Sequence, residues 1–199
     1  MATPLIDDDE LDDLEREFVA RVRGRVLEIG AGDGENFGAF DPDVEWQGLE
    51  PDATRRAELA TRAKEWRHVA VPLDAKAESI PLPDHSVDAV VGTYVLCSVT
   101  DQAAALAEVR RVLVPGGRVV FVDHVQAPPR TLKRFVQAVA TPIAKRVCHG
   151  CHWDRDTERA LADAGFVGRD IRRLRVRSMP FGPVPMLLFD GEAPGGVQA

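Results

Sequence analysis

A strand-like apolar run leads directly into three closely spaced glycines, in the sequence Val26-Leu27-Glu28-Ile29-Gly30-Ala31-Gly32-Asp33-Gly34. Glycine allows the left-handed backbone that a sharp strand-to-helix turn needs, and such a turn brings main-chain N–H groups close to a ligand. A dinucleotide fingerprint would place a further glycine where Glu35 stands. The pattern therefore favours a nucleoside ligand without a pyrophosphate. A tight turn that binds no ligand is the alternative.

An acidic residue ends the second predicted strand. Glu50 closes the segment 46–50 and stands twenty positions after Gly30. A carboxylate at this place in a nucleotide-binding fold can accept hydrogen bonds from both hydroxyls of a ribose. An exposed strand end and the ribose site of an NAD-dependent oxidoreductase are the alternatives.

Short strands alternate with helices along most of the chain. Hydrophobic patterns and Gly/Pro stops predict strands at 25–30, 46–51, 68–72, 87–96, 118–125, 171–178 and 185–191, and helices at 53–65, 102–113, 131–147 and 154–164. Repeated strand-helix-strand construction is typical of parallel sheets. The sequence therefore predicts an α/β fold. We expect a doubly wound, Rossmann-like, seven-stranded, mostly parallel sheet with helices on both faces and a C-terminal antiparallel hairpin.

The length of 199 residues suits a single domain. We expect an acidic amphipathic helix within 1–24 that acts as a cover, a catalytic domain at 25–192 and a flexible tail at 193–199. The formal charge is −7, and eight acidic residues lie between positions 7 and 17. Nucleic acid is therefore a disfavoured partner, because phosphate binding normally needs a basic face. The arginines between 169 and 177 alternate with apolar residues, which is typical of one solvated face of a strand.

The N-terminal residues 1–13 contain neither a basic leader nor an apolar stretch. No run in the sequence approaches the roughly 18 apolar residues that a membrane span needs. Three cysteines without an export signal do not favour a disulfide framework. We therefore expect a cytoplasmic protein without an integral membrane span, acting on a small molecule.

Three motifs together resemble the class I S-adenosylmethionine-dependent methyltransferases of the quinone-biosynthesis type. They are the glycine turn 26–34, the segment 77–88 and the segment 113–117, and the resemblance runs from about Arg25 to Gly168. It implies S-adenosylmethionine as the cofactor. The cofactor-binding residues that it implies are Glu28, Gly30, Ala31, Gly32, Gly34, Asn36, Glu50, Pro51, Ala77, Glu78 and Thr93. Lys76 departs from the family pattern, which often has an aspartate there. Contact with the adenine amine is therefore expected from Glu78 or from the main chain.

Further segments resemble a narrower group, the methyltransferase-like alkyl thiol methyltransferases of animals and their bacterial relatives. These segments are 93–99, 123–125, 149–151 and 155–157. The resemblance implies a small, apolar methyl acceptor and, most narrowly, thiol S-methylation. Thiols suit an in-line displacement, because a thiolate is a strong nucleophile. Alternative acceptors are a quinone-precursor ring carbon, a lipid amine, or another small-molecule nitrogen or oxygen. A cofactor-binding protein without turnover is the alternative from another class.

Three residues are candidates for the chemistry at the acceptor. His124 follows the fifth strand at the carboxyl edge of the sheet, where it can act as a base or orient the acceptor. Cys97 can line the acceptor pocket, and Tyr94 can position the sulfonium group. The alternatives are a hydrogen-bonded strand-end histidine, a small buried cysteine and a packed tyrosine.

The segment 148–152, Cys-His-Gly-Cys-His, matches the C-x-x-C-H pattern of haem attachment and contains zinc-ligand residue types. Haem attachment requires export, which the N-terminal residues do not indicate. Zinc binding is disfavoured because a second spaced Cys/His pair is lacking, so we expect no metal. The segment is interpreted as a turn over the acceptor pocket. His149, Cys151 and His152 either contact substrate or only form this turn.

Overall fold

The computed structural model describes residues 3–127, 131, 134, 137, 151–177 and 182–195. The strands are β1 (Leu5–Ile6), β2 (Arg25–Ile29), β3 (Glu45–Leu49), β4 (Val87–Thr93), β5 (Leu113–His124), β6 (Val167–Val176) and β7 (Val184–Glu192). The helices are α1 (Asp8–Val19), α2 (Ala53–Glu65), α3 (Gln102–Val112), α5 (Thr157–Asp163) and the short 3-10 helix η1 (Glu35–Ala39). The predicted helix at 131–147 and the segment 148–150 lie outside the described residues.

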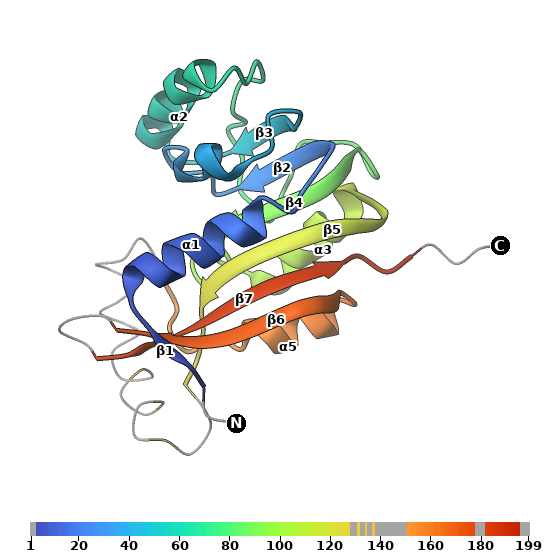
Figure 1. The fold of residues 1–199 in the computed structure, drawn as a ribbon. Helices are drawn as coiled ribbons and strands as arrows, with labels where there is room; N and C mark the ends of the chain where they lie inside the picture. The colour runs from blue at the N-terminus through green and yellow to red at the C-terminus, as the bar shows by residue number, and fades with distance from the viewer. Residues whose placement is uncertain are drawn as a thin grey trace.

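The strands form one seven-stranded sheet in the order β1-β6-β7-β5-β4-β2-β3. Strands β3, β2, β4 and β5 run parallel, whereas β7 is antiparallel to both β5 and β6. Figure 1 shows this twisted sheet with α1 in front of it and α3 and α5 behind it. The structure confirms the predicted fold class, including the C-terminal hairpin.

Alternation along the central strands divides the core into two layers. In β5, Val119 and Phe121 face one layer, and Val120 and Val122 face the other, as the two-residue repeat of a strand requires. The first layer includes Leu106 of α3. The second layer includes Phe18 of α1, which is fully buried. Helix α1 therefore belongs to the core of the fold, and it lies against the face of the sheet from which Val120 and Val122 point.

Aspartates fix where the helices begin. Asp7, Asp52, Asp101 and Asp156 each stand immediately before a helix, and each side chain accepts a main-chain N–H from its first turn. Helix α1 has a full capping box, because the Glu10 side chain also accepts the N–H of Asp7. Such caps satisfy N–H groups that the helix itself leaves unpaired.

One predicted strand was wrong. Residues 68–72 form no strand, and Val69 and Val71 are 98% and 78% exposed, with only Leu73 making an isolated bridge to Leu49. The seventh strand is instead β1, which pairs in parallel with β6. Its existence depends on pairing with a strand about 170 residues away, a contact that local periodicity cannot reveal.

Several boundaries also differ from the prediction. Strands β5 and β6 begin at Leu113 and Val167, earlier than the predicted 118 and 171. Strand β4 ends at Thr93 because Tyr94 has a φ of 58°, which no strand residue adopts. Helix α5 begins at Thr157, after its Asp156 cap, and is shorter than the predicted helix 154–164.

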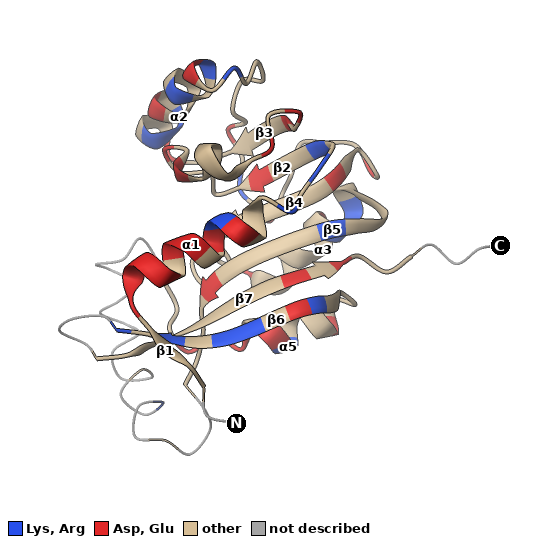
Figure 2. Ribbon diagram, in the orientation of Figure 1, with Lys and Arg blue, Asp and Glu red and all other residues tan. Residues whose placement is uncertain are grey.

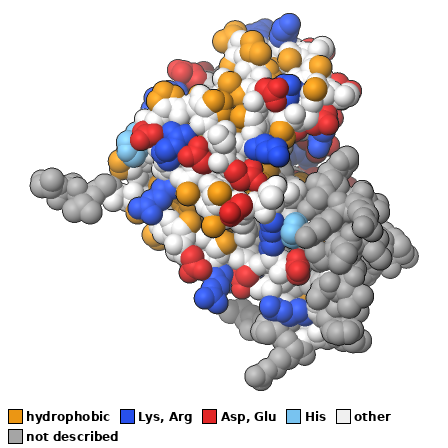
Figure 3. Space-filling model, turned by 180° about the vertical axis from the view of Figure 1, so that it is seen from behind, with side chains coloured by type: hydrophobic (Ala, Val, Ile, Leu, Met, Phe, Trp, Pro, Cys, Tyr) orange, Lys and Arg blue, Asp and Glu red, His pale blue; other side chains and the backbone are white. Residues whose placement is uncertain are grey.

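The arginines of β6 contact acidic side chains. Arg172 lies 3.0 Å from Glu17 of α1, while Arg169 and Arg173 pair with Glu192 and Glu158. Figure 2 shows the acidic α1 in front of the sheet and the basic β6 as a strand near its edge. On the opposite side of the molecule, acidic and basic side chains are interspersed over the described surface (Figure 3). Among the described helices, none is long and apolar enough to cross a bilayer.

Candidate active site

A cavity of about 930 Å³ lies at the carboxyl ends of β2, β3, β4 and β5. This volume is within the usual range for small-molecule sites, and open α/β sheets bind ligands at this edge. A second hollow, of about 610 Å³, lies near the amino ends of β2, β3 and β4. The predicted site residues that line the first cavity are Gly30, Glu50, Pro51, Ala77, Glu78, Tyr94, Cys97 and His124.

The glycine turn reaches this cavity through its first glycine, Gly30. Gly30, Gly32 and Gly34 have φ angles of 60°, 58° and 86°, in the left-handed region that glycine adopts without strain. A Cβ on Gly30 would lie 2.6 Å from Cγ2 of Val95, and one on Gly32 would lie 2.5 Å from the Arg55 guanidinium. The spacing of these glycines therefore has a steric as well as a conformational cause.

Glu50 is held rigidly at the end of β3. Its Oε2 accepts the N–H of Gly32 at 2.9 Å and its Oε1 accepts the N–H of Asp52 at 2.9 Å. The side chain is only 5% exposed but lines the cavity. Each carboxylate oxygen has a further lone pair that can accept a hydrogen bond. The geometry thus suits recognition of two neighbouring hydroxyl groups.

The segment 76–78 forms the far end of this part of the cavity. Ala77 is buried, and Lys76 and Glu78 also line the cavity. The Oε1 atom of Glu78 accepts the N–H groups of Thr100 and Asp101, at 2.7 and 3.2 Å. These bonds fix the Glu78 carboxylate at the start of α3. Its other oxygen is a suitable acceptor for an exocyclic amine.

Several predicted cofactor residues do not line the cavity. Asn36 donates one hydrogen bond to Glu28 at 2.7 Å and one to Thr93 at 2.9 Å, and the Trp46 indole also donates to Glu28. Burial raises the pKa of Glu28 to about 7, although these hydrogen bonds lower it. These hydrogen bonds join strands β2, β3 and β4 to Asn36, which follows the glycine turn. The predicted residues outside the lining are Glu28, Ala31, Gly32, Gly34, Asn36 and Thr93.

At the other end of the cavity, Tyr94 and His124 lie together. Their ring centroids are 5.3 Å apart, and the Tyr94 hydroxyl donates a hydrogen bond to Glu15 of α1. Burial raises the pKa of Glu15 to about 7. Sequence reasoning missed Glu15, although a signal was present. Its position places a carboxylate on the apolar face of α1, between Leu11 and Phe18.

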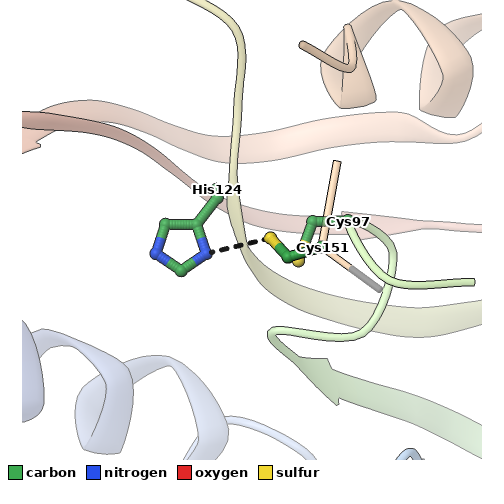
Figure 4. A group of neighbouring side chains, drawn as sticks. All are labelled: Cys97, His124 and Cys151. Atoms are coloured by element: carbon green, nitrogen blue, oxygen red, sulfur yellow. Dashed lines mark hydrogen bonds between the residues drawn. The ribbon is translucent and has the colours of Figure 1, made fainter. Parts of the chain in front are cut away.

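Two cysteine side chains lie beside His124. Figure 4 shows Cys97 after β4, His124 at the end of β5 and Cys151 converging at one point, with 3.8 Å between Cys151 Sγ and His124 Nδ1. Contact with the Cys151 thiol and burial raise the pKa of Cys97 to about 12. The Cys97 thiol is therefore protonated at neutral pH, which argues against a role as a covalent nucleophile.

The buried carboxyl of Asp123 is hydrogen-bonded to the main chain of Cys97. Asp123 Oδ1 accepts the N–H of Cys97 at 2.9 Å, and burial raises the pKa of Asp123 well above its usual range. Asp123 Oδ2 is buried and accepts no hydrogen bond from the part of the chain that the structure describes. The contact between Asp123 and the N–H of Cys97 was not predicted from the sequence. The carboxyl fixes the loop that carries Cys97.

The segment after Cys151 is anchored to the same loop. The main-chain N–H of His152 donates to the Cys97 carbonyl at 2.7 Å, which joins the two cysteine-bearing segments through their main chains. The Arg155 guanidinium adds to this frame, because it donates to the carbonyls of Leu96 and Val99, at 2.6 Å each. Cys97 and Cys151 are thus held in a fixed relationship by contacts that do not involve their thiols. Three residues of the C-x-x-C-H pattern precede Cys151 and lie outside the described residues, namely Cys148, His149 and Gly150.

Comparisons with known proteins identify the family of the chain. A family model described as a methyltransferase domain matches residues 27–121. Thiol S-methyltransferase TMT1B of Homo sapiens is 32% identical over 187 residues, which cover 87% of this chain and 77% of the human protein. Thiol S-methyltransferase TMT1B of Rattus norvegicus is 35% identical over 144 residues, which cover 71% of this chain and only 59% of the rat protein.

A solved structure shares this fold. The crystal structure of the YcgJ protein of Bacillus subtilis aligns with a TM-score of 0.73 and 20% identity, covering 94% of this chain and 99% of that one. The family match includes Gly30 and Glu50, which both line the cavity. The chain therefore belongs to the class I S-adenosylmethionine-dependent methyltransferases, and S-adenosylmethionine is its cofactor.

Proposed function

We propose that the protein methylates the sulfur of a small, apolar thiol. The observation that carries the proposal is the convergence of His124 with the Cys97 and Cys151 side chains in the same cavity as Gly30 and Glu50. The narrow resemblance to thiol S-methyltransferases supports it. The reaction would convert R–SH and S-adenosylmethionine to R–S–CH₃, S-adenosylhomocysteine and a proton.

The residues of the cavity fit this cofactor. Glu50 would accept hydrogen bonds from the ribose hydroxyls of the cofactor, and the turn at Gly30 would contact the amino-acid part. Glu78 would accept a hydrogen bond from the adenine amine. When bound, the cofactor supplies a methyl group on a positively charged sulfur. Binding orders the two reactants in one enclosed space, which removes much of the entropic barrier to a displacement.

The acceptor would lie at the His124 end of the cavity. Val95, Val99, Val184 and Trp153 contribute apolar lining to the cavity. Such a wall favours an apolar acceptor and keeps water from its sulfur. His124 would raise the thiolate population of the acceptor, and the Tyr94 ring against it would hold the imidazole in place.

The test is product analysis with purified protein, S-adenosylmethionine and a panel of small alkyl and aryl thiols, phenolic quinone precursors and amines. We expect a methyl thioether and an equal amount of S-adenosylhomocysteine. Methylation of a ring carbon or an amine without any thioether would contradict the proposal. Binding of S-adenosylhomocysteine without turnover of any acceptor would favour a non-catalytic cofactor-binding protein instead.

A matched pair of variants tests the role of His124. His124→Ala should lower kcat for the thiol by about 100-fold or more, as loss of an acid-base group does. Its Kd for S-adenosylhomocysteine should stay unchanged. His85→Asn serves as the control, because His85 bonds the Leu113 carbonyl at the far end of β5. Equal turnover in His124→Ala and the control would remove His124 from the mechanism.

A further inference from the structure

Three side chains that bind soft metal ions converge at the acceptor end of the cavity. The ligand atoms of Cys97, His124 and Cys151 all lie within 4.8 Å of one another. Figure 4 shows the three side chains meeting from separate parts of the fold, with the Cys151 Sγ and His124 Nδ1 atoms 3.8 Å apart. Zinc bonds of about 2.3 Å to sulfur and about 2.0 Å to nitrogen place a tetrahedral S–N pair about 3.5 Å apart and an S–S pair about 3.8 Å apart. The Cys151–His124 pair is within about 0.3 Å of its value, and small side-chain rotations would suffice for all three ligands.

The ligand set has the composition of a reactive zinc site. Structural zinc sites use four protein ligands, whereas catalytic sites use three and keep the fourth position open. Two cysteines with one histidine form one of the known catalytic sets. Within the described part of the chain, the cluster contains three such residues, and all three line the cavity. An ion held between them would be open to a ligand that enters the cavity.

Hydrogen bonds hold the main chain around these three side chains in place. Asp123 holds the N–H of Cys97, and the N–H of His152 holds the Cys97 carbonyl. Arg155 donates to three carbonyls of the loop that carries Cys97. A site whose ligands are already in place loses little conformational entropy on binding, and this favours metal affinity.

We propose that Cys97, His124 and Cys151 bind one Zn²⁺ ion, whose fourth coordination position opens into the acceptor cavity. The second ligand pair that the segment 148–152 lacks in sequence is supplied by the ends of β4 and β5. Sequence spacing could not indicate this pair, because Cys97 and His124 are brought to Cys151 only by the fold.

The role of the ion rests on the proposed thiol methylation, whereas its binding does not. An acceptor R–SH would give a sulfur lone pair to the zinc ion and its proton to water, so that it is held as a zinc-bound thiolate. The two cysteine ligands would likewise lose their protons, as thiols do on coordination. His124 would then act as a metal ligand, and the ion would perform the activation.

The first test is the metal content of the full chain, purified without chelators and then dialysed against Zn²⁺ and metal-free buffer. We expect about one zinc ion per chain. Cys97→Ser, Cys151→Ser and His124→Gln should each weaken zinc binding by at least about 10- to 100-fold. His85→Asn should retain the full amount. Wild-type protein without zinc, or variants that keep it, would overturn the proposal.

Two measurements guard against variants that simply fail to fold. Each variant should retain the thermal shift with S-adenosylhomocysteine, because Gly30 and Glu50 are untouched. On the wild-type chain, Co²⁺ loading should produce thiolate-to-cobalt charge-transfer absorption, and added Zn²⁺ should remove it. Absence of that absorption in Co²⁺-loaded wild type would contradict cysteine ligation.

Turnover by the metal-free protein separates this inference from the proposed function. We expect chelation to lower thiol methylation by at least about tenfold without changing S-adenosylhomocysteine binding, and Zn²⁺ but not Mg²⁺ to restore it. Full thiol turnover by metal-free protein would overturn the zinc role and leave the proposed function standing. A zinc-loaded protein that methylates no thiol would confirm the metal site and remove the proposed function.

Discussion

The Tyr94 hydroxyl donates a hydrogen bond to the Glu15 carboxylate, and this contact joins the end of β4 to the N-terminal helix α1. Tyr94 also lies against the ring of His124. Glu15 is therefore one residue away from the acceptor end of the cavity, although it is 79 positions from Tyr94 in the sequence. Helix α1 therefore contacts a residue that lines the cavity, besides packing in the core.

The burial of Glu15 predicts a dependence of stability on pH. Burial raises the pKa of Glu15 to about 7 from 4.5, with further increases from Asp12 and Glu35 and decreases from Tyr94 and His124. The folded chain then binds more protons than the unfolded chain, so the free energy of unfolding falls as pH rises from about 4.5 to about 7. The Glu15 contribution to this fall is about 2 to 3 kcal/mol.

Glu15→Gln should remove that contribution while keeping an acceptor for Tyr94. Urea unfolding at pH 5 and pH 8 should give a smaller difference in unfolding free energy for this variant than for wild type. Asp13→Asn, on the exposed face of the same helix, is the control and should behave as wild type. The same pH slope in Glu15→Gln and wild type would show that Glu15 titrates normally.

Glu50 should determine cofactor affinity. Glu50→Ala removes the proposed ribose acceptor and leaves the N–H groups of Gly32 and Asp52 without their bonds. We expect a loss of about 1 to 3 kcal/mol in the binding free energy of S-adenosylhomocysteine, measured by calorimetry. Glu45→Ala, on an exposed position of the same strand, should bind normally. Unchanged affinity in Glu50→Ala would refute the assignment.

A side chain at Gly30 should collide with Val95 and disturb the glycine turn. Gly30→Ala and Gly116→Ala both place an alanine at a positive φ, of 60° and 74°, which costs about 1 to 2 kcal/mol in each case. Only Gly30→Ala also creates a contact, at 2.6 Å from Val95, whereas a Cβ on Gly116 meets nothing within 4 Å. Gly30→Ala should therefore lose more stability and also lose cofactor affinity. Equal effects on cofactor binding would mean that the turn does not contact the ligand.

A buried carboxylate connects the end of α1 to the sheet behind it. Asp190 accepts hydrogen bonds from Arg118 at 2.7 and 2.8 Å and from Arg21 at 2.8 Å. Burial alone would raise the pKa of Asp190, but the two arginines lower it below its ordinary value. Its contribution to stability is therefore present near neutral pH and is lost as the pH falls through the pKa of the folded state.

Asp190→Asn should destabilise the fold by about 3 kcal/mol at pH 7, because two arginines lose their buried partner. Asp163→Asn, which breaks only the exposed pair with Arg159, should change stability by less than about 0.5 kcal/mol. Thermal unfolding at pH 7 measures both effects. Equal stability of the two variants would show that the ion pairs of Asp190 contribute little.

Gly30 and Glu50, two predicted residues that line the cavity, were recognisable in the sequence. Gly30 and Glu50 are short-range features, because each stands at the end of a strand whose hydrophobic pattern is readable in a few residues. The sheet class followed from the same alternation. The exchange of the predicted strand 68–72 for β1 shows the limit of this reasoning, since β1 exists only by pairing with β6.

The acceptor end was decided by the tertiary structure. Contacts there join Cys97 to Asp123, Cys151 to His124 and Tyr94 to Glu15, across 26, 27 and 79 positions. Local patterns of hydrophobicity and turn residues identified His124, Cys97 and Tyr94 as candidates, but they carry no information about such distances. The sequence by itself determined the strand-turn-helix unit, because backbone preferences act between neighbours. Only the packing of α1 against the face of the sheet, and of the segment from Cys151 onward against the loop that carries Cys97, brought the thiols, the imidazole and the carboxylate together.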